Sequence, residues 1–131
     1  MVFQIKVNWR VFVLEDARPR IEWFKARIPE ATYSNNAEDA ISILSNHSLF
    51  DVVFLDHDLT FSDVAFPDLR PGSGQRVARF LGQMGFPGLV VIHSVNEAGS
   101  RAIQKLLPNA QVSPFGTFDI VHVATTGSTT D

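Results

Sequence analysis

The sequence has no cysteine, so disulfide bonds, thiolate metal ligands and cysteine nucleophiles are excluded. Long hydrophobic runs are also missing, because every apolar stretch is far shorter than the ~20 residues that a membrane-spanning helix needs. The first residues, MVFQIKVNWR, lack the extended apolar segment of a signal peptide. From these absences we expect a soluble, cytoplasmic protein that does not associate with membranes.

Charged side chains are sparse as well. They make up 19% of the chain, the formal net charge is −3, and no basic stripe is visible. A protein that binds extended nucleic acid usually carries such a stripe, because it has to neutralise phosphates. We therefore expect no extended nucleic acid among the partners, and the composition leaves the oligomeric state open.

The chain has enough hydrophobic residues to fold as a single globular unit. Its 131 residues are 45% hydrophobic, which is sufficient to bury a core in one domain. We expect residues 1–124 to form that domain. The polar end TTGSTTD, residues 125–131, is expected to be a disordered tail.

Short apolar runs alternate with segments of helical periodicity along the whole chain. Strands are expected at residues 11–16, 31–34, 50–56, 88–94 and 110–115, and helices at 18–28, 35–47, 73–85 and 96–108. This alternation predicts a doubly wound α/β fold, in which helices cover both faces of a mainly parallel sheet.

Three further segments are less regular. Residues 2–7 are expected to form an extra edge strand or an arm. Residues 57–72 lack a clear period and are expected to form a long loop. Residues 117–124 are ambiguous but favour a strand, which makes a last helix doubtful.

Ionisable and polar side chains follow the three most apolar strands, at the point where each strand ends. In such sheets ligands bind at the carboxyl ends of the strands. Neighbouring strands lie about 4.8 Å apart, so three adjacent ends would span only about 10 Å. The side chains gathered there are Glu15, Asp16, Asp56, His57, Asp58, His93, Ser94 and Asn96.

The carboxylates in this group suggest a metal site. Glu15, Asp16 and Asp56 would repel one another unless a cation lay between them. Oxygen ligands suit Mg²⁺, and Mn²⁺ if an imidazole joins them. Asp58 either points to the same side as Asp56, two residues earlier, or caps the following turn.

The histidines and the nearby polar groups suggest proton transfer and anion binding. An imidazole titrates near neutral pH, so His57 and His93 are candidate acid and base, or metal ligands. Arg18 either binds a phosphate or forms a salt bridge with Asp16. Asn96 either helps to hold an anion at a helix N-terminus or is simply the N-cap.

The strand-end motifs resemble those of response-regulator receiver domains. Glu15 and Asp16 match the acidic pair of receivers, Asp56 the phosphate-accepting aspartate and Ser94 the hydroxyl position. The lysine that receivers carry before a proline after strand five is absent, because Ser113 stands there. The resemblance implies a flavodoxin-like fold with strand order 2-1-3-4-5.

A more specific family within the receiver superfamily is more similar to the sequence, over residues 11–115. The motifs LEDARP (14–19), LDHDL (55–59) and HSVNEAG (93–99) resemble those of the cyclic-phosphate processing receiver-like family. This resemblance implies a metal-assisted phosphoesterase acting on a cyclic nucleotide or a 2′,3′-cyclic phosphate. It assigns the metal to Glu15, Asp16 and Asp56, proton transfer to His57 and His93 with Asp58 beside them, and phosphate oxygens to Arg18, Ser94 and Asn96.

Two other functions fit the same residues. A non-catalytic receiver-like module would use the acidic pocket to bind a metal or a nucleotide in signalling. A phosphoacceptor would take up a phosphoryl group on Asp56.

Overall fold

Two parallel sheets organise the chain in the computed structural model, which describes residues 1–45, 50–59 and 73–124. The expected tail at 125–131 and most of the expected loop at 57–72 lie outside the described residues. Within the described residues, no helix is long and apolar enough to cross a membrane.

The main sheet has five parallel strands in the order β3-β2-β4-β5-β6. Numbered within that sheet along the chain, the order is 2-1-3-4-5, so the expected topology is confirmed. The strands are β2 (Val11–Leu14), β3 (Thr32–Ser34), β4 (Val52–Leu55), β5 (Leu89–Ile92) and β6 (Gln111–Val112).

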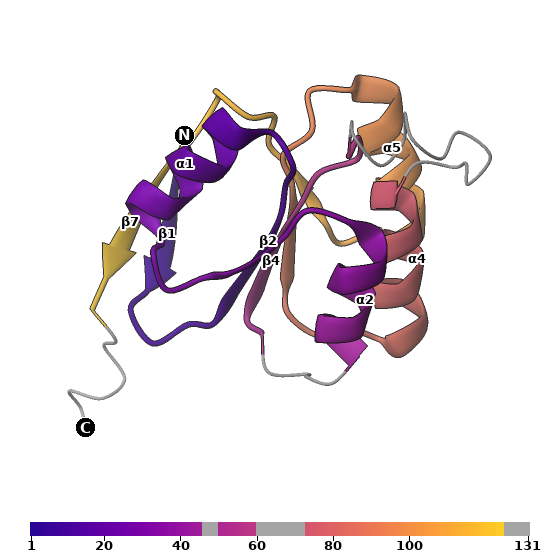
Figure 1. Cartoon of the computed structure of the whole chain (residues 1–131), viewed down its shortest axis with the longest axis horizontal. Coiled ribbons are helices and arrows are strands. Elements are labelled where there is room, and N and C mark those ends of the chain that lie inside the picture. The colour runs from indigo at the N-terminus through magenta and orange to yellow at the C-terminus, as the bar shows by residue number, and fades with distance from the viewer. Residues whose placement is uncertain (46–49, 60–72, 125–131) are drawn as a thin grey trace.

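The central strands are buried on both faces, which explains their continuous apolar sequences. One face packs against α2 (Ala37–Ser45), α4 (Ser73–Met84) and α5 (Glu97–Leu106), and α1 (Arg18–Arg27) lies on the other (Figure 1). Alternate residues of each strand therefore enter different cores. Phe12 and Val53 belong to the core under α2, α4 and α5, whereas Val13 and Phe54 belong to the core under α1.

The two ends of the described chain form a second, two-stranded parallel sheet. β1 (Val2–Lys6) pairs with β7 (Asp119–Val123), as Figure 1 shows beside α1. Phe3 and Ile5 of β1 and Ile120 of β7 are buried in the core under α1. The segment 117–124 therefore contains a strand, as favoured, and the strand within residues 2–7 pairs with it instead of extending the main sheet.

Candidate functional site

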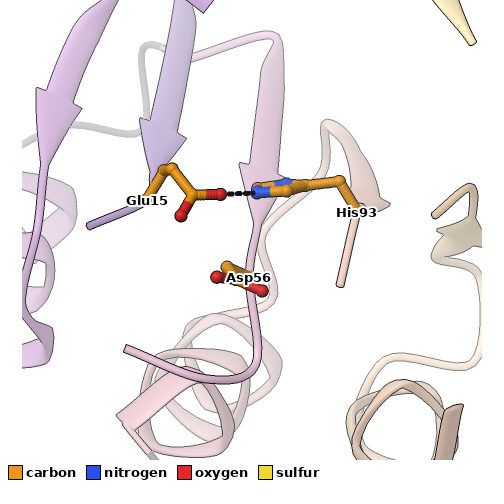
Figure 2. A group of neighbouring side chains, drawn as sticks. All are labelled: Glu15, Asp56 and His93. Carbon is orange, nitrogen blue, oxygen red and sulfur yellow. Dashed lines mark hydrogen bonds and ion pairs between the residues drawn. The ribbon is translucent and has the colours of Figure 1, made fainter. Parts of the chain in front are cut away.

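The strand register brings three ionisable side chains into one row. Leu14, Leu55 and Ile92 are aligned across β2, β4 and β5, so the residues that follow them are also neighbours. These are Glu15, Asp56 and His93, which point towards one another at the carboxyl ends of the strands (Figure 2). One potential ligand atom from each lies within 4.8 Å of the others, and all three side chains are buried.

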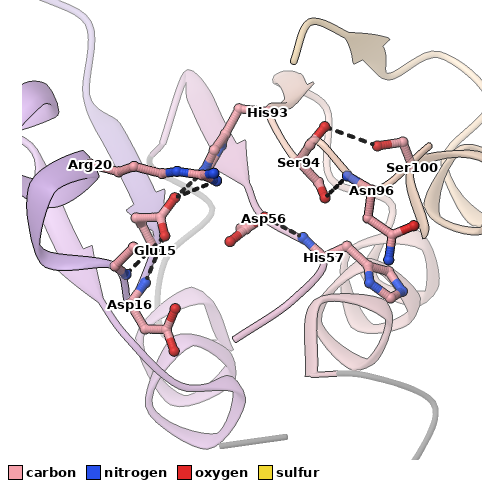
Figure 3. Close-up of polar contacts among 10 residues, drawn as sticks. Glu15, Asp16, Arg20, Asp56, His57, His93, Ser94, Asn96 and Ser100 are labelled. Carbon is pink, nitrogen blue, oxygen red and sulfur yellow. Dashed lines mark hydrogen bonds and ion pairs between the residues drawn. The ribbon is translucent and has the colours of Figure 1, made fainter. Parts of the chain in front are cut away.

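Glu15 is held in place by both of its carboxylate oxygens. Oε2 accepts backbone hydrogen bonds from Asp16 and Ala17 at 3.1 and 2.9 Å, and Oε1 accepts one from His93 Nε2 at 2.8 Å (Figure 3). Burial alone raises the pKa of Glu15, but these hydrogen bonds and the charge of Arg20 outweigh it and lower the pKa. Glu15 is therefore ionised, and its orientation is fixed before any ligand arrives.

His93 is fully buried between Glu15 and the ring of Phe24, whose centroid lies 5.2 Å from that of the imidazole. Burial lowers the pKa of His93, and the hydrogen bond to Glu15 offsets this only in part. The imidazole is thus neutral and donates its Nε2 proton to Glu15. Among the described residues, Nδ1 of His93 is the buried side-chain atom without a hydrogen-bond partner.

Asp56 is the member of the row whose ionisation is disfavoured. Its Oδ1 accepts a hydrogen bond from the backbone N–H of His57 at 2.9 Å. Burial, together with the negative charge of Glu15, raises the pKa of Asp56 to about 8. A cation beside Asp56 would relieve this repulsion, and two carboxylates with an imidazole suit Mg²⁺ or Mn²⁺. The row therefore fits a divalent metal.

A cavity of about 200 Å³ opens beside this row. Besides Glu15 and Asp56, three expected site residues form part of its wall: Asp16, Asp58, whose side chain is 48% exposed, and Ser94, which is buried. The Ser94 hydroxyl oxygen accepts a hydrogen bond from the backbone N–H of Asn96 at 3.0 Å. The complete lining consists of Glu15, Asp16, Ala17, Arg20, Asp56, Asp58, Ser94 and Val95.

His57 and His93, the two histidines expected at the site, lie on different faces of the main sheet, and neither is among the described residues that line the cavity. Successive side chains of a strand point to opposite faces, and His57 is one residue beyond Asp56. His93 therefore lies with Asp56 on the α1 face, whereas His57 lies against α4 and α5. Figure 3 shows the two rings on different sides of Asp56. The parity of the strand, which can be counted in the sequence, separates the two histidines.

The His57 ring is enclosed by polar partners and by a glycine. Nδ1 lies 2.7 Å from Asp58 Oδ1, and Nε2 lies 3.0 Å from the side-chain nitrogen of Gln75 on α4. A Cβ atom on Gly99 of α5 would come within 2.5 Å of the ring, so only glycine fits there. The His57 ring therefore orients the Asp58 side chain through this contact without lining the cavity itself.

Asn96 is the N-cap of α5, and it also contacts Asp58. Its side-chain oxygen accepts a hydrogen bond from the Gly99 N–H at 2.9 Å, which confirms the capping role considered above. Its amide nitrogen donates to Asp58 Oδ2 at 3.1 Å. Both oxygens of Asp58 are thus held, one by His57 and one by Asn96. Asn96 is not among the residues that line the cavity.

Arg18 and Arg20 occupy very different positions. The Arg18 side chain is 89% exposed and pairs with Glu22 at 3.5 Å, so the structure places it outside the cavity. Arg20 lines the cavity and was not expected from the sequence. Helical spacing contained the signal, because Arg20 lies four residues before the buried Phe24 and so shares its face of α1.

The parallel sheet with acidic side chains at the ends of its central strands defines a receiver-like domain. The model of the family called "Cyclic-phosphate processing Receiver domain" matches residues 10–109. The chain therefore belongs to this family. No curated protein has a significant sequence match to the chain.

Solved structures support the fold. The N-terminal domain of an uncharacterized protein, WS1339, from Wolinella succinogenes is similar with a TM-score of 0.62 and 16% identity over 83% of each chain. The receiver domain of the Francisella response regulator 1452 has a TM-score of 0.58 and 15% identity, covering 86% of this chain and 84% of its own. At these identities the likeness concerns the fold alone.

Proposed function

We propose that the protein is a metal-assisted phosphoesterase that hydrolyses a cyclic phosphate, such as a cyclic nucleotide or a 2′,3′-cyclic phosphate, to a monoester. The observation that carries the proposal is the buried row of Glu15, Asp56 and His93 beside a cavity of about 200 Å³. The description of the family as cyclic-phosphate processing supports the substrate class.

The metal would be Mg²⁺ or Mn²⁺, held by Glu15, Asp56 and His93. Coordination through Nε2 of His93 would replace the proton that this atom now donates to Glu15. Asp16 also lines the cavity and is a candidate for a fourth ligand. When bound, such a cation neutralises charge on the phosphate oxygens and favours attack at phosphorus. In this proposal His93 is a metal ligand and does not exchange protons with the substrate.

Asp58 is the side chain we assign to proton transfer. Its two oxygens are held by His57 and Asn96, and it forms part of the cavity wall. Asp58 takes a proton from the attacking water as the new P–O bond forms, and later returns it to solvent. The P–O bond to the ribose oxygen breaks, and the alkoxide takes a proton from bulk water. The reaction thus consumes one water and opens the ring, while His57 acts as a positioning residue.

A panel of cyclic phosphates tests this proposal. The purified protein is incubated with 3′,5′-cyclic nucleotides, 2′,3′-cyclic nucleotides and cyclic oligonucleotides, each with Mg²⁺, with Mn²⁺ and with chelator. We expect metal-dependent ring opening that is lost in Asp56→Asn and Asp58→Asn. The exposed Asp39 provides the matched control, and Asp39→Asn should retain activity. Turnover that persists in chelator or in Asp58→Asn would contradict the mechanism.

A second candidate function is a non-catalytic module that binds a metal or a nucleotide. The observation that favours it is that no histidine is among the described residues lining the cavity, because His57 is enclosed and His93 is fully buried. Metal-dependent ligand binding without ring opening of any panel member would support this function over hydrolysis.

A further inference from the structure

The cavity wall is strongly acidic and contains one cationic side chain. Of the described residues that line it, four carry carboxyl groups, and Arg20 alone carries a positive charge. A phosphate diester is an anion and would be repelled by the carboxylates. Binding it therefore requires positive charge from the protein as well as from a metal.

Arg20 is held by an aromatic platform. Its guanidinium carbon lies 5.0 Å from the centroid of the Phe115 ring, a favourable cation–π distance. Phe115 is itself fixed, because its backbone N–H donates to the carbonyl of His93 at 2.8 Å and its ring packs edge-on against Trp23. Because the side chain is supported in this way, little conformational entropy remains to be lost when it binds a ligand.

The contact between Arg20 and Glu15 does not occupy the N–H donors of the guanidinium. The Nη1 atom lies 4.0 Å from Glu15 Oε1, which is an ion pair without a hydrogen bond (Figure 3). Both oxygens of Glu15 already accept shorter hydrogen bonds from Asp16, Ala17 and His93.

From this geometry we propose that Arg20 binds the two non-bridging oxygens of the substrate phosphate. A guanidinium presents parallel N–H donors whose spacing matches such a pair of oxygens, which an ammonium group does not. The inference rests on the proposed function for the identity of the ligand. It assigns the phosphate contact to Arg20 and not to Arg18, which is exposed and paired with Glu22.

Binding of inorganic phosphate tests this assignment without requiring turnover. Affinities for phosphate in saturating Mn²⁺, and for Mn²⁺ alone, are measured by calorimetry at fixed ionic strength for the wild type, Arg20→Gln, Arg20→Lys and Arg18→Gln. The last variant removes the same charge two residues earlier on the same helix. Circular dichroism checks that each variant is folded, and Arg20→Lys serves if Arg20→Gln is not.

We expect Arg20→Gln to weaken phosphate binding by about tenfold or more, as for loss of a charge-assisted hydrogen bond. Arg20→Lys should lie in between, and Arg18→Gln should match the wild type. Mn²⁺ alone should bind Arg20→Gln at least as tightly as the wild type, because a repelling cation has been removed. A merely structural role for Arg20 would instead weaken Mn²⁺ binding as well.

The outcomes separate this inference from the proposed hydrolysis. Unchanged phosphate affinity in Arg20→Gln, or no phosphate binding by the wild type in Mn²⁺, would overturn the role of Arg20. Phosphate binding that depends on Arg20, together with no turnover of any cyclic phosphate, would uphold the role of Arg20 and refute the hydrolase.

Discussion

Asp56 is expected to destabilise the metal-free protein, and its replacement by asparagine should reveal by how much. The side chain is 3% exposed and its pKa is raised to about 8 from 3.8, by burial and by the charge of Glu15. At pH 7 this carboxyl is mostly protonated in the folded state, whereas in the unfolded chain it would lose its proton roughly three pH units below pH 7. At about 1.4 kcal/mol per unit, the cost is at most ~4 kcal/mol.

The sign of the pH dependence follows from the direction of the shift. A carboxyl whose folded pKa is raised binds its proton more tightly in the folded state, which favours folding at low pH. That stability is fully present below pH 3.8 and is lost as the pH rises towards 8. The free energy of unfolding in chelator should therefore fall over this range in the wild type, and less so in Asp56→Asn.

Asparagine is a suitable replacement because its side-chain oxygen can still accept the hydrogen bond from the His57 N–H. We expect Asp56→Asn to be more stable than the wild type at pH 7 in chelator by about 1–4 kcal/mol. At roughly 3–5 °C per kcal/mol, its melting temperature should rise by at least a few degrees. Asp39→Asn, which removes an equal charge from an exposed position, should stay within about 0.5 kcal/mol of the wild type.

Addition of metal should act in the opposite direction, stabilising the wild type relative to Asp56→Asn. A ligand that binds only the folded state stabilises it by about 2.7 kcal/mol at a concentration of 100 times its Kd. Mn²⁺ should therefore raise the melting temperature of the wild type and leave that of Asp56→Asn nearly unchanged. The reasoning is refuted if Asp56→Asn is no more stable than the wild type in chelator at pH 7, as measured by thermal and urea unfolding.

Three further substitutions test the support of Asp58 and the site backbone. Gly74→Ala should destabilise the protein by several kcal/mol in urea unfolding, because its Cβ would lie 2.1 Å from the Asp56 carbonyl oxygen, a backbone atom. Gly99→Ala should cost less, about 1–3 kcal/mol, because its Cβ meets the His57 ring, and a shifted His57 resonance in NMR spectra should accompany the loss. Asn96→Ala should cost about 1 kcal/mol as a lost N-cap and should lower kcat if Asp58 acts as proposed; an unchanged urea midpoint would contradict the capping role.

The main sheet was predictable because its central strands can be recognised from their local sequence. Nearly every residue of the runs VFVL, VVFL and LVVI is buried, and continuous apolar strands of this kind are typical of the centre of a parallel sheet. The pairing of β1 with β7 was not predictable in the same way. β1 buries alternate residues and β7 buries Ile120, but the two strands lie at opposite ends of the described chain, and no local sequence pattern indicates that they pair.

The site was predictable in its membership more than in its geometry. Glu15, Asp56 and His93 were all expected at strand ends, but the sequence did not single them out as one row, because it grouped Asp16 with the carboxylates and left His93 open as an acid, a base or a metal ligand. The distinction depends on register. Because Leu14, Leu55 and Ile92 align, the first residue after each strand joins one row. The second residues differ, because Asp16 and Ser94 line the cavity whereas His57 lies against α4 and α5. The alignment is set by long-range pairing, which apolar runs of similar length do not specify.

In the segment Asp56-His57-Asp58, alternation along the strand decides which side chains reach the cavity. Alternation places Asp56 in the row with Glu15 and His93 on the α1 face, and His57 on the opposite face, where Gln75 and Gly99 enclose its ring. The backbone N–H of His57 still donates to Asp56, at 2.9 Å, while its ring contacts Asp58 at 2.7 Å. One buried residue thus contacts both carboxylates without lining the cavity between them. A strand ending in three ionisable residues therefore places only two of them at the cavity, and the histidine between them fixes their orientation.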